Sequence, residues 1–469
     1  MKPWTNEGLL IDKNALRFER RQCIDEGKDL SSVQAEFDAL LASELDEDLA
    51  LQARAGKLLD RTARLRVKPG HPFREPSDLV AIRKARRGKV KLPKVTLTDE
   101  AILEKVLGAW LGRSAGCLLG KPVEGRRREE IEGYLRAHGQ WPLKEYFPQP
   151  ASEEIRQQFH FPGQDNPCWH CYAENITCMV EDDDTNYTTT GLAIVKEYGK
   201  DFTPANVARF WLCNIPIFHT FTAERVAYRN LVGMVPPPGL DGKVDGRFSS
   251  ASYRNVAREW IGAQIRADFF GYVNPANPER AAEYAWRDAC ISHVKNGIYG
   301  EMWVAAMLAS AYVIDRDVEK VIRAGMGQIP ARSRLHADLT EVLAWHKEGL
   351  EYAQAVDRIH KRWDENTFHH WCHTNSNAQI VAMALLWGQM DFGQTISYAV
   401  MAGLDTDCNG ASAGSVLGLM LGGGRIPSQW TDPMNDTLLT GVAGYHTVKL
   451  SEMARNTLDL IRRDRPPDN

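Results

Sequence analysis

The amino-acid sequence predicts an all-α fold, a compact bundle of many helices. Apolar residues recur at three- and four-residue intervals over long stretches, such as residues 98–120, 278–314 and 376–403. This spacing is the period of an α-helix with one apolar face. Segments that alternate apolar and polar residues are scarce, and no strand–helix–strand rhythm is present. Few strands and no α/β architecture are therefore expected.

The first hundred residues differ in pattern from the remainder of the chain. Residues 30–65 have helical apolar spacing, whereas residues 66–100 contain four prolines and many basic residues. Prolines and charge at this density indicate a connecting segment, which we expect to lie along the surface of the next domain. Its basic cluster, residues 83–91, is expected to be solvated. The sequence thus predicts an N-terminal helical extension with a basic linker (1–97) and a second domain (98–469).

Composition and charge exclude several classes of protein. The 469 residues are 43% hydrophobic and carry a net charge of −4, so neither nucleic acid nor a membrane surface is expected as the main partner. No apolar run approaches the roughly 20 residues of a membrane span, and the N-terminus lacks a signal-peptide core. Nine cysteines, an odd number, favour reduced thiols and a cytoplasmic protein. The oligomeric state stays open.

Two helical segments each have glycines four residues apart. Each such glycine costs about 1 kcal/mol relative to alanine in a helix, so eight of them need a reason. We expect the two helices to pack at the centre with their backbones in close contact. A membrane dimer is excluded because the first segment contains Arg113 and the second is shorter than a bilayer span. The glycines are Gly108, Gly112, Gly116, Gly120, Gly410, Gly414, Gly418 and Gly422.

Three acidic elements stand at the ends of apolar or glycine-rich helices. Residues 181–184 are four consecutive acids before an apolar helix, more than the one or two that a helix start favours. Asp405 and Asp407 precede the second glycine-rich helix, and Glu124 follows the first. If those helices pack side by side, the acids meet and form an oxygen-lined site for Mg²⁺ or Mn²⁺. Two ions would suit this number of carboxylates.

These motifs, in this order, resemble those of the ADP-ribosylglycohydrolase family, which includes the dinitrogenase reductase-activating glycohydrolases. The matching segments are "GAWLGRSAGCLLGKPVEG", "DDDTNYTTTGLA", "IGAQIRADFFG", "ISH" and "GLDTDCNGASAGSVLG". They cover about residues 98–424, and the two aspartate motifs are the most specific. The resemblance implies an all-α bundle with a dinuclear Mg²⁺ or Mn²⁺ centre.

The resemblance also implies roles for individual residues. Glu124 would position or deprotonate the attacking water, with Asp183 as the second catalytic residue. The amides near Gly262 and Ala263 would bind phosphates, and His293 would line the site. The expected metal ligands are Asp182, Asp183, Asp184, Asp405 and Asp407. The expected substrate-binding residues are Gly262, Ala263, Gln264, Arg266, His293, His373, Asn375 and Cys408.

The sequence departs from the family pattern at the metal motifs. Asp182 stands where the family usually has Thr or Ser, so the site is expected to carry one more negative charge. Cys408 stands where a Thr hydroxyl is usual, and sulfur is a poor ligand for Mg²⁺. The implied function is a metal-dependent glycohydrolase that cleaves the anomeric bond of an ADP-ribosyl or related ribosyl conjugate. Its partner would be a small ribosyl molecule or an ADP-ribosylated protein.

Three alternatives stay open. The chain could be an N-ribosyl hydrolase of small nucleoside-like molecules, with aromatic-rich segments at residues 167–172, 210–221 and 368–377 closing over a base. It could be a catalytically silent protein that binds an ADP-ribose-type ligand. A zinc protein organised by Cys168 and Cys171 is the third reading, although no second pair of ligands has matching spacing.

Overall fold

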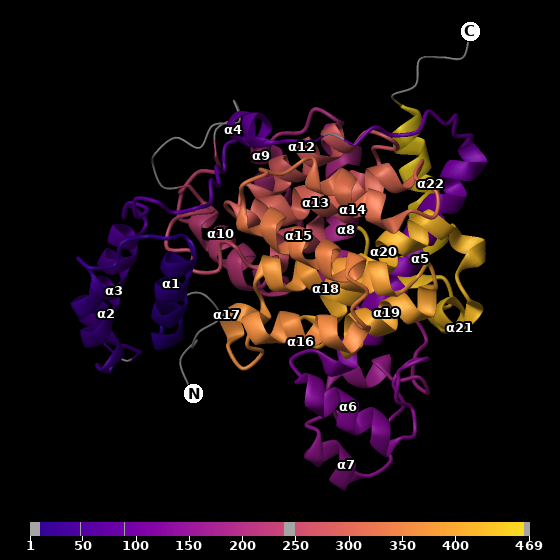
Figure 1. The fold of residues 1–469 in the computed structure, drawn as a ribbon, viewed down its shortest axis with the longest axis horizontal. Helices are drawn as coiled ribbons and strands as arrows, with labels where there is room; N and C mark the ends of the chain where they lie inside the picture. The colour runs from indigo at the N-terminus through magenta and orange to yellow at the C-terminus, as the bar shows by residue number, and fades with distance from the viewer. Residues whose placement is uncertain (1–9, 47, 89, 239–248, 464–469) are drawn as a thin grey trace.

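The computed structural model describes residues 10–46, 48–88, 90–238 and 249–463. In these residues the fold is all-α, as the sequence predicts (Figure 1). Their one sheet is an antiparallel pair, β1 (Thr437–Leu439) and β2 (Thr447–Lys449), in which Leu438 lies opposite Val448. None of the described helices combines the length and apolar character that crossing a membrane requires.

Two helices run face to face through the centre of the fold, α5 (Asp99–Gly120) and α20 (Thr406–Leu421). Gly112 lies against Gly414, and a methyl group on either would collide with the carbonyl oxygen of the other. The same holds for Gly116 with Gly410 and for Gly108 with Gly418. The predicted close contact of two glycine-rich helices is therefore confirmed. No side chain separates the backbones, which explains why glycine is needed at each crossing point.

Other helices surround this pair. Every residue of α13 (Asn296–Ala311) is buried, as is every residue of α18 (Thr374–Trp387). The remaining helices of this part are α6 (Arg128–Ala137), α7 (Glu153–Gln158), α8 (Asp183–Tyr198), α9 (Pro204–Asn214), α10 (Thr222–Val232), α11 (Asp268–Tyr272), α12 (Pro278–Ala289), α14 (Val318–Met326), α15 (Arg334–Lys347), α16 (Tyr352–Arg362), α17 (Phe368–Trp371), α19 (Phe392–Met401), α21 (Ser428–Thr431) and α22 (Leu450–Arg462). Short 3₁₀ turns follow α5, at Lys121–Val123, and precede α11, at Ile261–Arg266.

The N-terminal helices form a small core of their own. They are α1 (Lys13–Asp25), α2 (Gln34–Leu41) and α3 (Leu49–Thr62), and Figure 1 shows them in indigo at one side of the molecule. Leu16, Phe37 and Leu58 are fully buried among them. A hydrophobic cluster separate from the main core is the usual mark of an independent folding unit. The boundary at residue 97 stays a prediction.

The proline-rich segment returns along the main bundle and carries α4 (Leu79–Ala85). Glu75 pairs with Arg334 of α15 at 2.7 Å, and the indole nitrogen of Trp286 donates to the carbonyl of Ser77 at 2.9 Å. The segment thus follows the surface of the later helices, as the sequence led us to expect.

Candidate metal centre

The predicted acids come together at one cavity of about 540 Å³. Packing of the glycine-rich helices places the end of α5 against the start of α20, where the hydroxyl of Thr406 donates to the carbonyl of Gly120 at 2.8 Å. Glu124 follows α5, and Asp405 directly precedes α20. The start of α8 supplies the third acidic element. We call the resulting group the acidic cluster: Glu124, Asp182, Asp183, Asp184, Asp405 and Asp407. All of its members except Asp184 line the cavity.

Helix starts explain how the chain accommodates adjacent carboxylates. Asp182 is the N-cap of α8, and its Oδ1 accepts a hydrogen bond from the amide of Asp184 at 2.9 Å. Asp183 and Asp184 occupy the first turn of α8, and Asp407 the first turn of α20. The free amides and partial positive charge of a helix N-terminus stabilise negative charge there.

Two basic side chains neutralise part of the acidic cluster. Arg113 of α5 is fully buried and pairs with Asp184 and with Asp268, each at 2.8 Å. Lys121 forms a short ion pair with Asp182. The extra negative charge expected from an aspartate at position 182 is therefore compensated by a lysine next to it. Nothing in the local sequence around either residue indicates this pairing.

The remaining carboxylates form no direct ion pair with a basic side chain of the described residues, and their pKa values are raised. The negative charge of Asp407 is the main reason that the pKa of Glu124 is raised to about 8, since the residue itself is exposed. Burial, followed by the charge of Asp182, raises the pKa of Asp407 to about 6. Burial raises the pKa values of Asp183 and Asp405 well above the usual range, and neighbouring aspartates add to the effect. Repulsion of this kind is what a bound cation would relieve.

The donor set fits a divalent ion. Oδ2 of Asp184 and Oδ1 of Asp407 are buried and accept no hydrogen bond, a costly arrangement unless a cation binds there. Two groups of side chains have ligand atoms within 4.8 Å of one another. Asp405, Asp407 and Cys408 form one group. Cys117, Asp182, Asp184 and Asp407 form the other.

The predicted substrate-binding residues divide into two sets. Gly262 and Cys408 line the cavity. Ala263, Gln264 and Arg266 lie in the same 3₁₀ turn as Gly262 but are buried behind it. The guanidinium of Arg266 pairs with Asp288, contacts Glu224 at 2.5 Å and donates to Ser292 at 2.9 Å. Its donors are thus used within the protein core.

The predicted histidines and Asn375 are also buried away from the cavity lining. Nδ1 of His293 contacts the hydroxyl of Ser292 at 2.8 Å. The ring of His373 stacks on Trp363 with centroids 5.1 Å apart. The side-chain amide of Asn375 donates to Asp338 at 2.6 Å.

All three aromatic-rich segments reach the cavity. Pro167 and Cys168 come from the first segment. The other two contribute what we call the aromatic wall: Phe218, Phe221, Phe368 and Trp371. Phe218, Phe221 and Phe368 are each 45–49% exposed, and a group of exposed apolar side chains at a cavity is typical of a binding site. Glu224 also lines the cavity, and burial raises its pKa to about 7. Sequence reasoning did not single out Glu224.

The two cysteines of the zinc alternative do not form a metal site. Among the described residues, Cys168 and Cys171 belong to no group of metal-ligating side chains.

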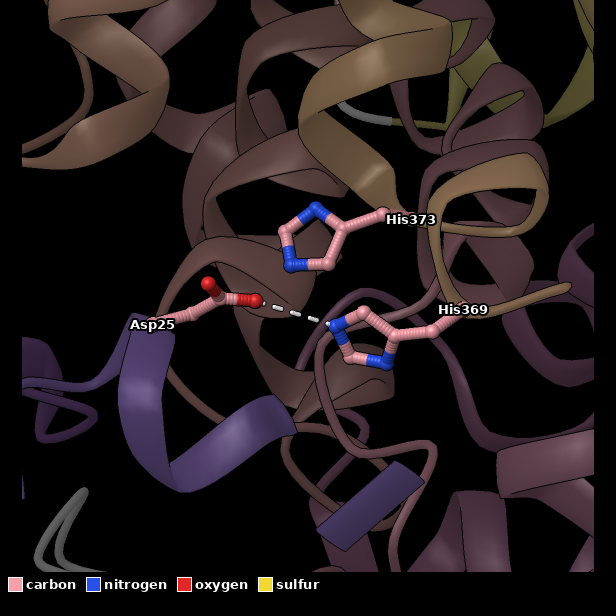
Figure 2. Close-up of side chains that lie close together, drawn as sticks. All are labelled: Asp25, His369 and His373. Atoms are coloured by element: carbon pink, nitrogen blue, oxygen red, sulfur yellow. Dashed lines mark hydrogen bonds and ion pairs between the residues drawn. The ribbon is translucent and has the colours of Figure 1, made fainter. Parts of the chain in front are cut away.

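A further group, Asp25, His369 and His373, joins α1 to the residues beside the aromatic wall (Figure 2). Nδ1 of His369 accepts from the indole of Trp260, and Nδ1 of His373 accepts from the amide of Asn375, both at 3.1 Å. The neutral rings therefore carry their proton on Nε2. A protonated nitrogen cannot bind a metal. Nε2 of His369 donates to Asp25, whereas Nε2 of His373 has no hydrogen-bond partner, so the contact of Asp25 with His369 is the junction between the two parts of the chain.

Comparison with known proteins agrees with this arrangement of motifs. The model of the ADP-ribosylglycohydrolase family matches residues 98–466, which is most of the chain. The chain belongs to the ADP-ribosylglycohydrolase family. It is accordingly a hydrolase of the glycosidase type, and the family is generally metal-dependent. The match begins where α5 begins, so α1–α4 lie outside the ADP-ribosylglycohydrolase region.

A solved structure with the description "ADP-ribosylglycohydrolase-related protein complex" is similar to this chain at 19% identity and a TM-score of 0.43. The similarity covers 78% of this chain and 100% of that one. No curated protein matches the chain.

Proposed function

We propose that the protein is a divalent-metal-dependent glycohydrolase that cleaves the anomeric bond of an ADP-ribosyl or closely related ribosyl conjugate. The observation that carries this proposal is the acidic cluster: carboxylates from three distant segments converge on one cavity next to buried, unpartnered oxygens. A volume of about 540 Å³ lies within the range typical of small-molecule sites.

The proposed metal is Mg²⁺ or Mn²⁺, and the resemblance to the family implies a site for two ions. Oxygen donors from Asp183, Asp405 and Asp407, with Asp182 and Asp184 behind them, suit hard divalent cations. Such ions, when bound, polarise the oxygens of a ribose and lower the pKa of a water molecule.

Glu124 is the proposed base for that water. It lines the cavity beside Asp407, and once bound cations offset the negative charge of the aspartates its carboxylate can accept a proton from the attacking water. As the bond from the anomeric carbon to the leaving group breaks, positive charge develops on the ribose. The carboxylates of Asp183 and Asp405 would stabilise this charge.

The aromatic wall favours a substrate with a planar group. Phe218, Phe221 and Trp371 offer apolar faces on which an adenine or other base can stack. Because the same faces would also bind a nucleoside, the small-molecule N-ribosyl hydrolase is the second candidate function.

One screen separates the candidates. The protein is incubated with Mg²⁺ or Mn²⁺ and with ADP-ribosylated proteins, ADP-ribose esters or nucleosides, and released ADP-ribose or ribose is quantified. Release from the first two classes supports the primary proposal, and release from nucleosides alone supports the second. If every class stays intact while ADP-ribose raises the Tm, the protein is a binding protein and the catalytic proposal is wrong.

A further inference from the structure

The side chain of Lys121 enters the acidic cluster. Lys121 follows directly after α5, so the glycine contact between α5 and α20 determines where its backbone lies. Its side chain is only 15% exposed and lines the cavity. Nζ pairs with Oδ2 of Asp182, and the charges of Asp407 and Glu124 also stabilise the ammonium. The chain thus has a cation of its own among the carboxylates.

Lys121 leaves Asp182 less available than the other aspartates. Oδ1 of Asp182 accepts from the amide of Asp184, and Oδ2 is paired with Lys121. Both oxygens of Asp182 are therefore engaged within the protein. In contrast, Oδ1 of Asp407 accepts no hydrogen bond although the residue is only 2% exposed.

The two groups of ligand atoms consequently differ in charge. The group of Cys117, Asp182, Asp184 and Asp407 already contacts two cations, Lys121 and Arg113, and it shares Asp407 with the group of Asp405, Asp407 and Cys408. Within the described residues, no ion pair joins Asp405 or Asp407 to a basic side chain, although the charge of Lys121 also acts on Asp407. A divalent ion among Cys117, Asp182 and Asp184 would lie next to both the ammonium and the guanidinium, whereas one at Asp405, Asp407 and Cys408 would meet carboxylates that form no ion pair.

We propose that Lys121 is a built-in cation that takes the place of one of the two expected metal ions, so that the chain binds a single divalent ion at Asp405, Asp407 and Cys408. This inference rests on the proposed function, because it assumes that the acidic cluster binds metal. It assigns Lys121 a positioning role: the ammonium keeps Asp182 at the start of α8 without a second ion.

The test is the number of metal ions bound per chain. Metal-free protein is titrated with Mn²⁺ by calorimetry, and the bound metal is counted by elemental analysis after gel filtration. Low-temperature electron paramagnetic resonance then distinguishes isolated Mn²⁺ from a spin-coupled pair. We expect one ion and an uncoupled spectrum for the natural chain, and two ions with a coupled spectrum for Lys121→Met.

Two further variants make the result specific to the charge at this position. Lys121→Arg keeps the charge and should still bind one ion. Lys105→Met is the control for removing a partly buried lysine elsewhere. Lys105 lies in α5, and its Nζ contacts the carbonyls of Leu419 and Met420 away from the cavity. This variant should also bind one ion.

The outcomes separate this inference from the proposed function. Two ions in the natural chain would overturn the inference and leave a metal-dependent glycohydrolase in place. No ion in the natural chain would overturn both. One ion in the natural chain and still one in a folded Lys121→Met variant would show that Lys121 does not replace a metal. If Lys121→Met does not fold, the counts for the natural chain and Lys121→Arg still decide, because either one binding two ions contradicts the inference.

Discussion

The carboxylate of Asp25 lies 3.1 Å from Nε2 of His369, 344 residues further along the chain. This contact joins α1 of the N-terminal extension to α17, the short helix that carries Phe368 and Trp371 of the aromatic wall. Burial by itself would raise the pKa of Asp25, but the hydrogen bond from His369 and nearby positive charge lower it to about 2. The extension therefore contacts a structural element of the candidate site.

Replacing Asp25 with alanine should destabilise the protein. The change leaves the N–H of the buried His369 without its acceptor, which costs about 1–3 kcal/mol. Asp38→Ala removes an exposed pairing with Arg20 in the same extension and should change stability by less than about 0.5 kcal/mol. Urea unfolding followed by circular dichroism measures both free energies, and equal losses would contradict the role of the junction.

Adding a single methyl group between the central helices should also destabilise the fold. A Cβ at Gly116 would collide with the carbonyl oxygen of Gly410. Because backbone cannot move aside as a side chain can, we expect Gly116→Ala to cost about 3 kcal/mol, despite alanine's better helix propensity. At Gly163 the nearest atoms to a Cβ are 3.5 Å away, so Gly163→Ala should be tolerated. Thermal unfolding of the two variants gives the comparison.

Removing one carboxylate from either aspartate motif should abolish turnover. Asp183→Asn and Asp405→Asn each remove a carboxylate of the acidic cluster, and kcat/KM on the substrate found by the screen should fall by about 100-fold or more. In Asp405→Asn the rise in Tm on adding Mn²⁺ should also disappear, while the helical circular dichroism spectrum of both variants stays unchanged. Asp201→Asn, at an exposed position, is the control. Full turnover by the double variant would rule out the metal-centre proposal.

Without metal, stability should fall as the pH rises. Glu124 and Asp407 have raised pKa values in the folded protein, about 8 and about 6, so between pH 4 and 8 these two groups bind more protons in the folded state than in the unfolded state. The free energy of unfolding therefore decreases with increasing pH over this range. In EDTA the Tm should drop between pH 5 and 8, and Mn²⁺ should reverse the drop. Glu124→Gln should flatten the upper part of this curve, and a Tm that rises with pH in EDTA would contradict the assignment.

The thiol at position 408 should favour Mn²⁺ over Mg²⁺. Cys408 lies within 4.8 Å of the ligand atoms of Asp405 and Asp407, and sulfur is a softer donor than the oxygen that Mg²⁺ prefers. Cys408→Thr should therefore bind Mg²⁺ more tightly relative to Mn²⁺, as measured by calorimetry with each ion. Cys290→Ser, which changes a buried thiol of the core, should leave this ratio unchanged. A ratio that Cys408→Thr does not alter would show that sulfur is not a ligand.

The features that sequence patterns predicted are those specified by local spacing. Glycines at every fourth position define one face of a helix, which is why the contact of α5 with α20 could be predicted. That contact in turn placed Glu124 near Asp405 and Asp407. Each step depends only on helical geometry and on which residues adjoin a helix end.

The features that sequence patterns missed depend on side chains that meet across the fold. Lys121 pairs with Asp182, 61 residues away, and a lysine after a helix is ordinarily solvated. Arg266 belongs to the motif expected to bind substrate, yet Glu224 and Asp288 surround its guanidinium in the core. Where a long side chain ends is decided by the packing of several helices, and no local pattern contains that information.

The seam of glycines between α5 and α20 has a consequence for how such a protein can diverge. No atom can be added where the glycines of α5 and α20 meet. We therefore expect few changes in these helices and in the residues beside their ends, Glu124, Asp405 and Asp407. Phe218, Phe221 and Phe368 also line the cavity, are half exposed and are not part of this helix contact. New substrate preferences can therefore arise by exchanging these aromatic residues while the hydrolytic chemistry is conserved.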